Sequence, residues 1–136
     1  MRKLLLACAS VALLGCGGDS TGPSASAVGT WNLQTVNGSG LPYTVIFVAS
    51  PVYRLEILSD QVLVNADGTY AETSSVRETN GSTVTTSTEQ DDGTWSQHGN
   101  QVDVTSNADG SVSTAVISGD KLTLAAQGVN AVYVRQ

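Results

Sequence analysis

The sequence predicts an all-β protein, an antiparallel up-and-down meander that closes into a small barrel of about 8–10 strands. Apolar and polar residues alternate with the period of two that is typical of half-buried strands, and no window shows a helical stripe. Turn dipeptides such as Asn-Gly and Asp-Gly recur about every 8–12 residues, the spacing of hairpins in sandwiches and barrels. Because the turns are short, neighbouring strands are expected to pair, and closure removes exposed sheet edges.

The first strands are justified by their alternation. The segment GTWNLQTV places Trp31 and Leu33 on one face and polar residues on the other. The next run, YTVIFV at 43–48, is apolar on both faces, as in a strand that is covered on both sides. In YRLEIL at 53–58 the inward residues alternate with Arg and Glu, and Ser-Asp at 59–60 is expected to turn the chain before QVLVN.

The remaining strands follow the same rule, and each is ended by a turn signal. They are expected at 69–78, 83–90, 94–97, 101–106, 111–118, 121–126 and 131–136. The paired carboxylates Asp91 and Asp92 fall in the expected turn DDG and are interpreted as solvated. The repeated segment NADG, at 65–68 and 107–110, is interpreted as a hairpin turn, because it lacks the ligand spacing of an EF-hand calcium loop.

Residues 1–15 are predicted to be a secretory signal peptide. Two cationic residues precede an eleven-residue apolar run at 4–14, which is shorter than the ~20 residues of a membrane-spanning helix. An uncleaved membrane anchor is the alternative. The segment LLGC, ending at Cys16, resembles the lipobox of bacterial lipoproteins. This resemblance implies that the Cys16 thiol receives a diacylglycerol, that the peptidase cuts before it, and that the new amine is acylated.

The resemblance also implies a destination in the cell envelope. Gly17 follows the cysteine, whereas an aspartate there would resemble an inner-membrane retention signal, so the outer membrane is the expected location. Two or three acyl chains on one cysteine hold a protein at a membrane far more firmly than one. Cys8 is lost with the leader, so the exported domain is expected to contain neither a free thiol nor a disulfide.

The mature chain is expected to have two parts. Residues 16–27 comprise the lipidated cysteine and a flexible tether rich in Gly and Ser, and residues 28–136 form the barrel domain. The tether would span roughly 18 Å as a coil, and an ordered N-terminal arm is the alternative. After removal of the leader the chain keeps four basic and all twelve acidic residues, a net charge of −8. Nucleic-acid binding is therefore not expected, and membrane residence is expected to depend on the lipid.

The opening of the barrel domain resembles a known family. Gly29 and Trp31 in VGTWNLQTV match the Gly-x-Trp motif of lipocalin-like domains. The later segments NADGTY, GTWSQHGNQVDV and SGDKLTL resemble bacterial lipocalin-like lipoproteins. The resemblance implies a small barrel with Trp31 at its closed end and a small hydrophobic ligand. The chain is shorter than a typical secreted lipocalin and lacks its disulfide and C-terminal helix.

The sequence predicts a non-enzymatic protein without a cofactor or a metal. Its one histidine, His98, lies in the turn QHGN, and no nucleophile with an orienting acid is recognisable beside it. One histidine and no available cysteine do not provide the three or four ligands of a zinc site.

Two functions fit this pattern. The first is a membrane-anchored module that binds a small hydrophobic ligand; the candidate lining residues are Trp31, Tyr43, Phe47, Tyr53 and Tyr70. In the alternative these aromatics fill the barrel. The second function is therefore that of a non-enzymatic structural or interaction protein, which would present the hairpin at 71–92 to an envelope partner. This hairpin is polar on both faces apart from Val76 and Val84, so it either projects into water or lines a polar mouth.

Overall fold

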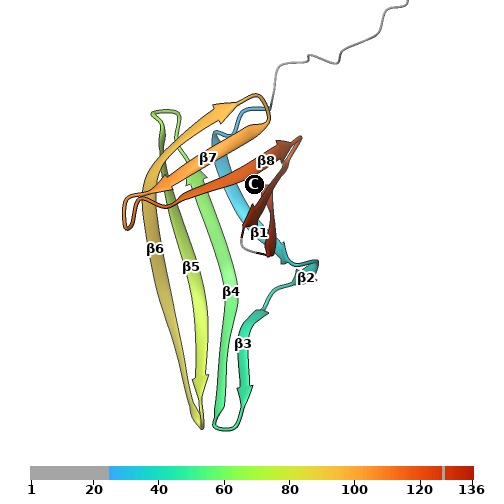
Figure 1. The fold of residues 1–136 in the computed structure, drawn as a ribbon, viewed down its shortest axis with the longest axis vertical. Coiled ribbons are helices and arrows are strands. Elements are labelled where there is room, and N and C mark those ends of the chain that lie inside the picture. Colours follow the sequence, from blue (N-terminus) through green and yellow to red (C-terminus); the bar gives the residue numbers. More distant parts are fainter. Residues whose placement is uncertain (1–24, 127) are drawn as a thin grey trace, which may run out of the picture.

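The computed structural model describes residues 25–126 and 128–136 of the chain. These residues form ten strands in one antiparallel sheet (Figure 1). The strands are β1 (Gly29–Val36), β2 (Ser39–Gly40), β3 (Tyr43–Ala49), β4 (Val52–Val64), β5 (Thr69–Asn80), β6 (Thr83–His98), β7 (Gln101–Ser106), β8 (Val112–Ser118), β9 (Lys121–Ala126) and β10 (Val129–Arg135). No helix in the described residues is long and apolar enough to cross a bilayer.

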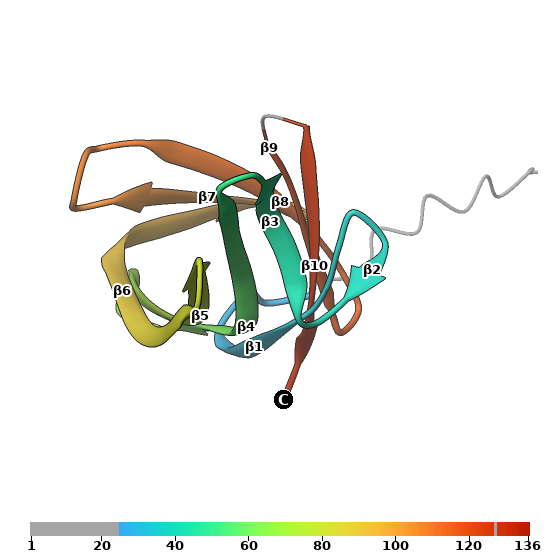
Figure 2. The same cartoon turned by 90° about the horizontal axis from the view of Figure 1, so that it is seen from below.

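The sheet closes because β1 pairs with β10 on one side and with β4 on the other. The closed ring comprises β1 and β4 to β10, eight strands that follow one another around the barrel axis in Figure 2. The two additional strands, β2 and β3, pair on the outer edges of β1 and β4. The predicted all-β meander that closes into a small barrel is therefore confirmed.

Alternation decides which side chains enter the barrel. In β8, Ala115 and Ile117 are buried, whereas Thr114, Val116 and Ser118 are exposed. The same period of two continues around the ring and produces one apolar core. Its buried members are Ala27, Trp31, Leu33, Val36, Val64, Val102, Ala115, Ile117, Leu122, Ala131 and Tyr133. Burial of each larger aliphatic side chain stabilises the fold by about 1.5–3 kcal/mol.

Trp31 and Arg135 organise one end of the barrel. The Trp31 side chain is fully buried, and its Nε1 donates a hydrogen bond to the carbonyl oxygen of Ala27 at 2.8 Å. The Arg135 guanidinium lies 4.2 Å from the centre of the indole ring and donates to the carbonyl oxygen of Val28. Gly29 has a φ of +142°, and a Cβ there would lie 2.7 Å from Arg135 Nη1. Glycine at this position therefore allows the arginine to reach the tryptophan.

The chain segment before β1 crosses this same end of the barrel. Ala27 is completely buried, and its backbone N–H donates to Gln97 Oε1 at 2.9 Å. Gln97 Nε2 donates in turn to the carbonyl oxygen of Ala25 at 2.8 Å. The sequence assigned residues 25–27 to the flexible tether, but these contacts hold them against the barrel. The predicted signal peptide at 1–15, Cys16 and the residues up to 24 lie outside the described residues.

Both NADG segments form hairpin turns, between β4 and β5 and between β7 and β8. In the first turn Asp67 Oδ1 accepts a hydrogen bond from the Thr69 backbone N–H at 3.0 Å. In the second turn Asp109 Oδ1 accepts from the Ser111 backbone N–H at 2.8 Å. An aspartate that binds the backbone two residues further on is a common way of stabilising a tight turn.

Two segments interpreted as turns lie inside long strands instead. Ser59 and Asp60 belong to β4, where a bulge between Ile57 and Ser59 bends the strand without reversing it. The DDG segment belongs to β6, which runs without interruption from 83 to 98. A Cβ at Gly93 would lie 1.9 Å from the carbonyl oxygen of Thr105, so the glycine permits a close approach of β7.

The outer halves of these long strands form a second structure beyond the barrel, here called the projecting sheet. It consists of β3 with residues 52–58 of β4, 75–80 of β5 and 83–89 of β6 (Figure 1). The outer half of the polar 71–92 hairpin thus projects, while its inner half belongs to the barrel wall.

The expectation that the run at 43–48 is a covered strand is wrong. Val45, Ile46, Phe47 and Val48 of β3 are all exposed, and Phe47 retains 57% of its accessible surface. The reason is the position of β3 in the fold. It pairs only with β4, at the edge of the projecting sheet and outside the closed ring.

Candidate functional site

A cavity of about 240 Å³ lies inside the barrel. Seven of the eight ring strands contribute inward-facing side chains to it, and residues from β4, β7, β8 and β9 make most of its wall aliphatic. The lining residues are Val62, Val64, Tyr70, Glu72, Asp91, Val102, Val104, Ser106, Ser111, Ser113, Ala115, Leu122, Leu124 and Tyr133. Because one wall is apolar and one end is polar, the cavity suits a small amphiphilic molecule better than water alone.

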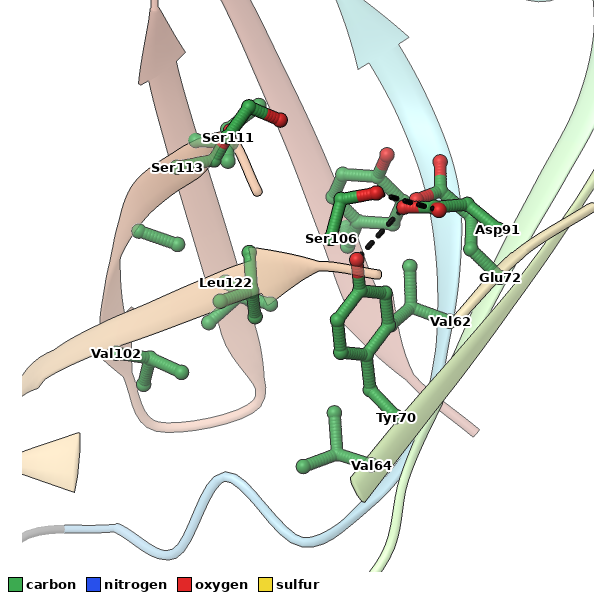
Figure 3. A pocket seen from close by; sticks show the side chains of 14 residues that line it. Val62, Val64, Tyr70, Glu72, Asp91, Val102, Ser106, Ser111, Ser113 and Leu122 are labelled. Carbon is green, nitrogen blue, oxygen red and sulfur yellow. Dashed lines mark hydrogen bonds between the residues drawn. The ribbon is translucent and has the colours of Figure 1, made fainter. Parts of the chain in front are cut away.

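Asp91 is held at the polar end of the cavity by two hydroxyl groups (Figure 3). The Tyr70 hydroxyl donates to Asp91 Oδ2 at 2.6 Å, and Ser106 Oγ donates to Asp91 Oδ1 at 2.7 Å. The hydrogen bond from Tyr70, followed by that from Ser106, lowers the pKa of Asp91 below its ordinary value. Burial, together with the neighbouring Asp91 carboxylate, raises the pKa of Tyr70. Asp91 is therefore a fixed, ionised carboxylate.

Glu72 lies at the same end of the cavity but has the opposite protonation behaviour. Burial is the largest cause, and with the negative charges of Asp60 and Asp91 it raises the pKa of Glu72 to about 8. Asp60 occupies the next inward position of β4 beyond Val62, the residue that pairs with Glu72. At neutral pH Glu72 therefore holds a proton that it can share with Asp60.

Asp60 is the most deeply buried carboxylate of this group. Only 8% of its surface is accessible, and its Oδ2 accepts a hydrogen bond from Ser74 Oγ at 2.7 Å. Its Oδ1 is buried and has no hydrogen-bond partner within the described part of the chain. Tyr133 of β10 faces the same carboxylates, and burial followed by the charge of Asp60 raises the pKa of its hydroxyl.

Of the five aromatic residues predicted to line a ligand, Tyr70 lines this cavity. Trp31 is buried at the barrel end where residues 25–28 cross, and Tyr43 is half-buried beside the core. Tyr53 and Phe47 belong to the projecting sheet, where Arg54 lies 5.2 Å from the centre of the Phe47 ring. The structure therefore does not bring the five aromatics together, because three of them lie outside the barrel interior.

The sequence reasoning did not find the three carboxylates of the polar end. Asp60 and Asp91 were assigned to turns, and Glu72 was only part of a segment that is polar on both faces. That segment carried a usable signal, because a barrel strand with polar residues at inward positions is one of the two ways to explain it. Tyr70, Glu72 and Ser74 are indeed successive inward positions of β5, and the first two line the cavity.

The chemistry of the polar end favours holding a ligand. A protonated carboxyl beside an ionised one is the arrangement that general acid–base catalysis uses. Here, however, both oxygens of Asp91 are already engaged by Tyr70 and Ser106. No group of three or more His, Cys, Asp or Glu side chains among the described residues is arranged to hold a metal ion.

The comparison with protein families agrees with the fold. The family model of the lipocalin-like domain matches residues 28–124, which is most of the chain and includes nine of the ten strands in whole or in part. A search of the curated proteins found no match.

Proposed function

Because this chain belongs to the lipocalin-like domain family, we propose that its barrel binds a small hydrophobic molecule inside the cavity. The observation that carries this proposal is the cavity of about 240 Å³ with its aliphatic wall. A cavity of about 150 Å³ in an apolar core already accommodates benzene, so this one has room for a somewhat larger molecule. A space of this size inside the ring argues against the alternative of a completely filled barrel.

The expected affinity follows from the apolar surface that a ligand buries. Each methylene transferred from water contributes about 0.8 kcal/mol, so six methylenes contribute about 5 kcal/mol. That free energy corresponds to a Kd between about 0.1 and 1 mM. A linear alcohol such as 1-octanol is therefore a suitable neutral probe for the apolar part of the site.

We expect 1-octanol to shift the methyl resonances of Val102 and Leu122 saturably in an NMR titration, with a Kd below about 1 mM. The variant Ala115→Leu places a larger side chain in the cavity and is expected to weaken binding at least tenfold. Ala125→Leu, at an exposed position of the neighbouring β9, is the matched control and should bind as the wild type does. Unchanged binding by a folded Ala115→Leu variant would contradict the proposal.

We also infer that the protein is exported and held at the outer membrane by lipid on Cys16. The apolar run at 4–14 and the lipobox-like LLGC support this inference. The position of residues 25–27 is compatible with it. They lie at the Trp31 end of the barrel, opposite the carboxylates of the cavity.

The anchor is tested by Cys16→Ser, which is expected to move the protein from the membrane fraction to the soluble fraction. The wild type should yield a mature N-terminal peptide that begins at Cys16 and has the mass of its acyl chains. Cys8→Ser is the control, because Cys8 lies in the leader and should not change the fractionation. Membrane association of the Cys16→Ser protein, or an unmodified mature N-terminus, would argue against a lipoprotein.

Binding without catalysis is the activity that the described residues support best. His98 is exposed at the turn between β6 and β7, beside the Trp31 end, whereas the carboxylates lie at the other end of the cavity. Asp91, the ionised member of the group, has both oxygens occupied and is poorly placed to accept a further proton.

A further inference from the structure

The polar end of the cavity contains negative charge without a matching positive charge. The described residues include four basic side chains. Arg77 Nε pairs with Glu56 at 2.8 Å in the projecting sheet, and Arg54 lies 3.9 Å from the same carboxylate. Arg135 stacks on Trp31 at the opposite end, and Lys121 is exposed at the start of β9. Glu72 thus faces both Asp60 and Asp91, and none of the basic side chains in the described residues lies there to balance these charges.

The imbalance is clearest at one buried oxygen atom of Asp60. Its side chain is more than nine-tenths buried, it points to the barrel interior beside Glu72, and its Oδ1 has no partner in the described chain. Leaving a buried polar atom without a hydrogen bond costs about 1–3 kcal/mol, and more when the group is charged. In the free protein the proton on Glu72 is a partner that this carboxylate can share. A ligand N–H that replaces this proton would supply the hydrogen bond in its place.

The cavity also offers an apolar surface to a ligand. Two of the carboxylates, Glu72 and Asp91, line one end of a wall built by Val62, Val102 and Leu122, so a ligand in this space meets hydrocarbon and negative charge together. We propose that the occupant is a small amphiphilic amine, whose ammonium group pairs with Glu72 beside Asp60 and whose hydrocarbon part lies against the aliphatic wall. This inference rests on the proposed function and specifies the class of ligand.

Binding of such a cation is coupled to a proton. At neutral pH Glu72 keeps its proton, since its pKa is raised to about 8. The charged groups that face it are Asp60 on β4 and Asp91 on β6, with the Tyr133 hydroxyl on β10. An arriving ammonium favours the ionised carboxylate, so Glu72 releases its proton to solvent and forms an ion pair. Affinity for an alkylamine is therefore expected to rise between about pH 6 and 8.5.

Three probes that share an eight-carbon hydrocarbon chain and differ in their polar group test the inference: octylamine, 1-octanol and octanoic acid. We expect octylamine to bind the wild type at least tenfold more tightly than 1-octanol at pH 8, and octanoate to bind most weakly. Calorimetry at pH 7 in buffers of different ionisation enthalpy should report the release of close to one proton for octylamine and none for 1-octanol.

Glu72→Gln should reduce the preference for octylamine over 1-octanol and abolish the proton release. Glu78→Gln removes the same charge at an exposed position of β5 and should preserve both. Asp60→Asn provides a second removal of charge should the first variant fold poorly, with circular dichroism as the check on folding. Preservation of the full preference in folded Glu72→Gln and Asp60→Asn proteins would overturn the inference.

The outcomes separate the two proposals. Equal affinity for octylamine and 1-octanol, or a preference for octanoate, would overturn the amine as the ligand class while leaving a hydrophobic site intact. No saturable binding of any of the three probes would contradict the proposed function itself, and the amine inference with it.

Discussion

Replacing Trp31 with alanine is expected to lower the free energy of unfolding by about 3–5 kcal/mol. The indole is fully buried, so its removal leaves a cavity at the end of the barrel where residues 25–28 cross. The Nε1 hydrogen bond to Ala27 and the stacking of Arg135 are lost at the same time. A domain of this size is stable by about 5–15 kcal/mol in total, so the variant is expected to lie close to unfolding.

Urea denaturation followed by circular dichroism measures this effect. Phe47→Ala is the matched control, because it also truncates an aromatic side chain but one that is largely exposed. We expect the control to lose less than about 1 kcal/mol. Trp31→Phe should fall between the two, since it keeps an aromatic ring and removes the Nε1 donor. Equal losses for Trp31→Ala and Phe47→Ala would show that this end of the barrel does not determine stability.

The sequence was sufficient to predict the parts of the fold that depend on local patterns. Strand β1 coincides with the run of alternating residues around Trp31 and Leu33, and both NADG segments are turns. In each case the side chain or backbone that determines the structure is contained within a few residues. The Gly-x-Trp motif was also recognisable from the local sequence. The need for its glycine, however, comes from the last strand, because Arg135 approaches Trp31 there.

The sequence failed where distant contacts decide the outcome. Ser59-Asp60 and Asp91-Asp92-Gly93 have the composition of turns, yet both continue through long strands. At Gly93 the deciding contact is the carbonyl oxygen of Thr105, which no local pattern includes. The carboxylates of the candidate site were missed for this reason, because an aspartate in a turn is exposed, whereas an aspartate at an inward position of a barrel strand faces the interior.

The exposure of β3 has the same origin. The apolar composition of β3 is typical of a strand that is covered on both faces. Both faces are nevertheless accessible, because β3 lies at the edge of the projecting sheet. Conversely, the segment at 71–92 was polar on both faces for two reasons at once. Its outer half projects into solvent, and its inner half provides Glu72 and Asp91 to the cavity.

Replacing Glu72 with glutamine is expected to stabilise the protein at high pH and to change its stability little at pH 5. Burial and the neighbouring Asp60 and Asp91 raise the pKa of Glu72 to about 8 in the folded state, from an ordinary value near 4.5. Between these two values the folded chain retains a proton that the unfolded chain has released. The contribution of Glu72 to the stability of the wild type therefore falls as the pH rises from about 5 to 8, and then levels off.

The size of the effect follows from the shift. Each unit corresponds to about 1.4 kcal/mol, so the full shift sets an upper bound of about 5 kcal/mol. Because Glu72 is only partly buried and solvent screens its charge, we expect Glu72→Gln to gain on the order of 2–4 kcal/mol over the wild type at pH 9. Denaturant titrations of both proteins at pH 5, 7 and 9 measure the difference, in which the titration of unrelated groups cancels. Glu78→Gln, exposed on the same strand, separates burial from the loss of a charge. A pH-independent difference between Glu72→Gln and the wild type would mean that Glu72 ionises freely, and that the polar end of the cavity is open to water.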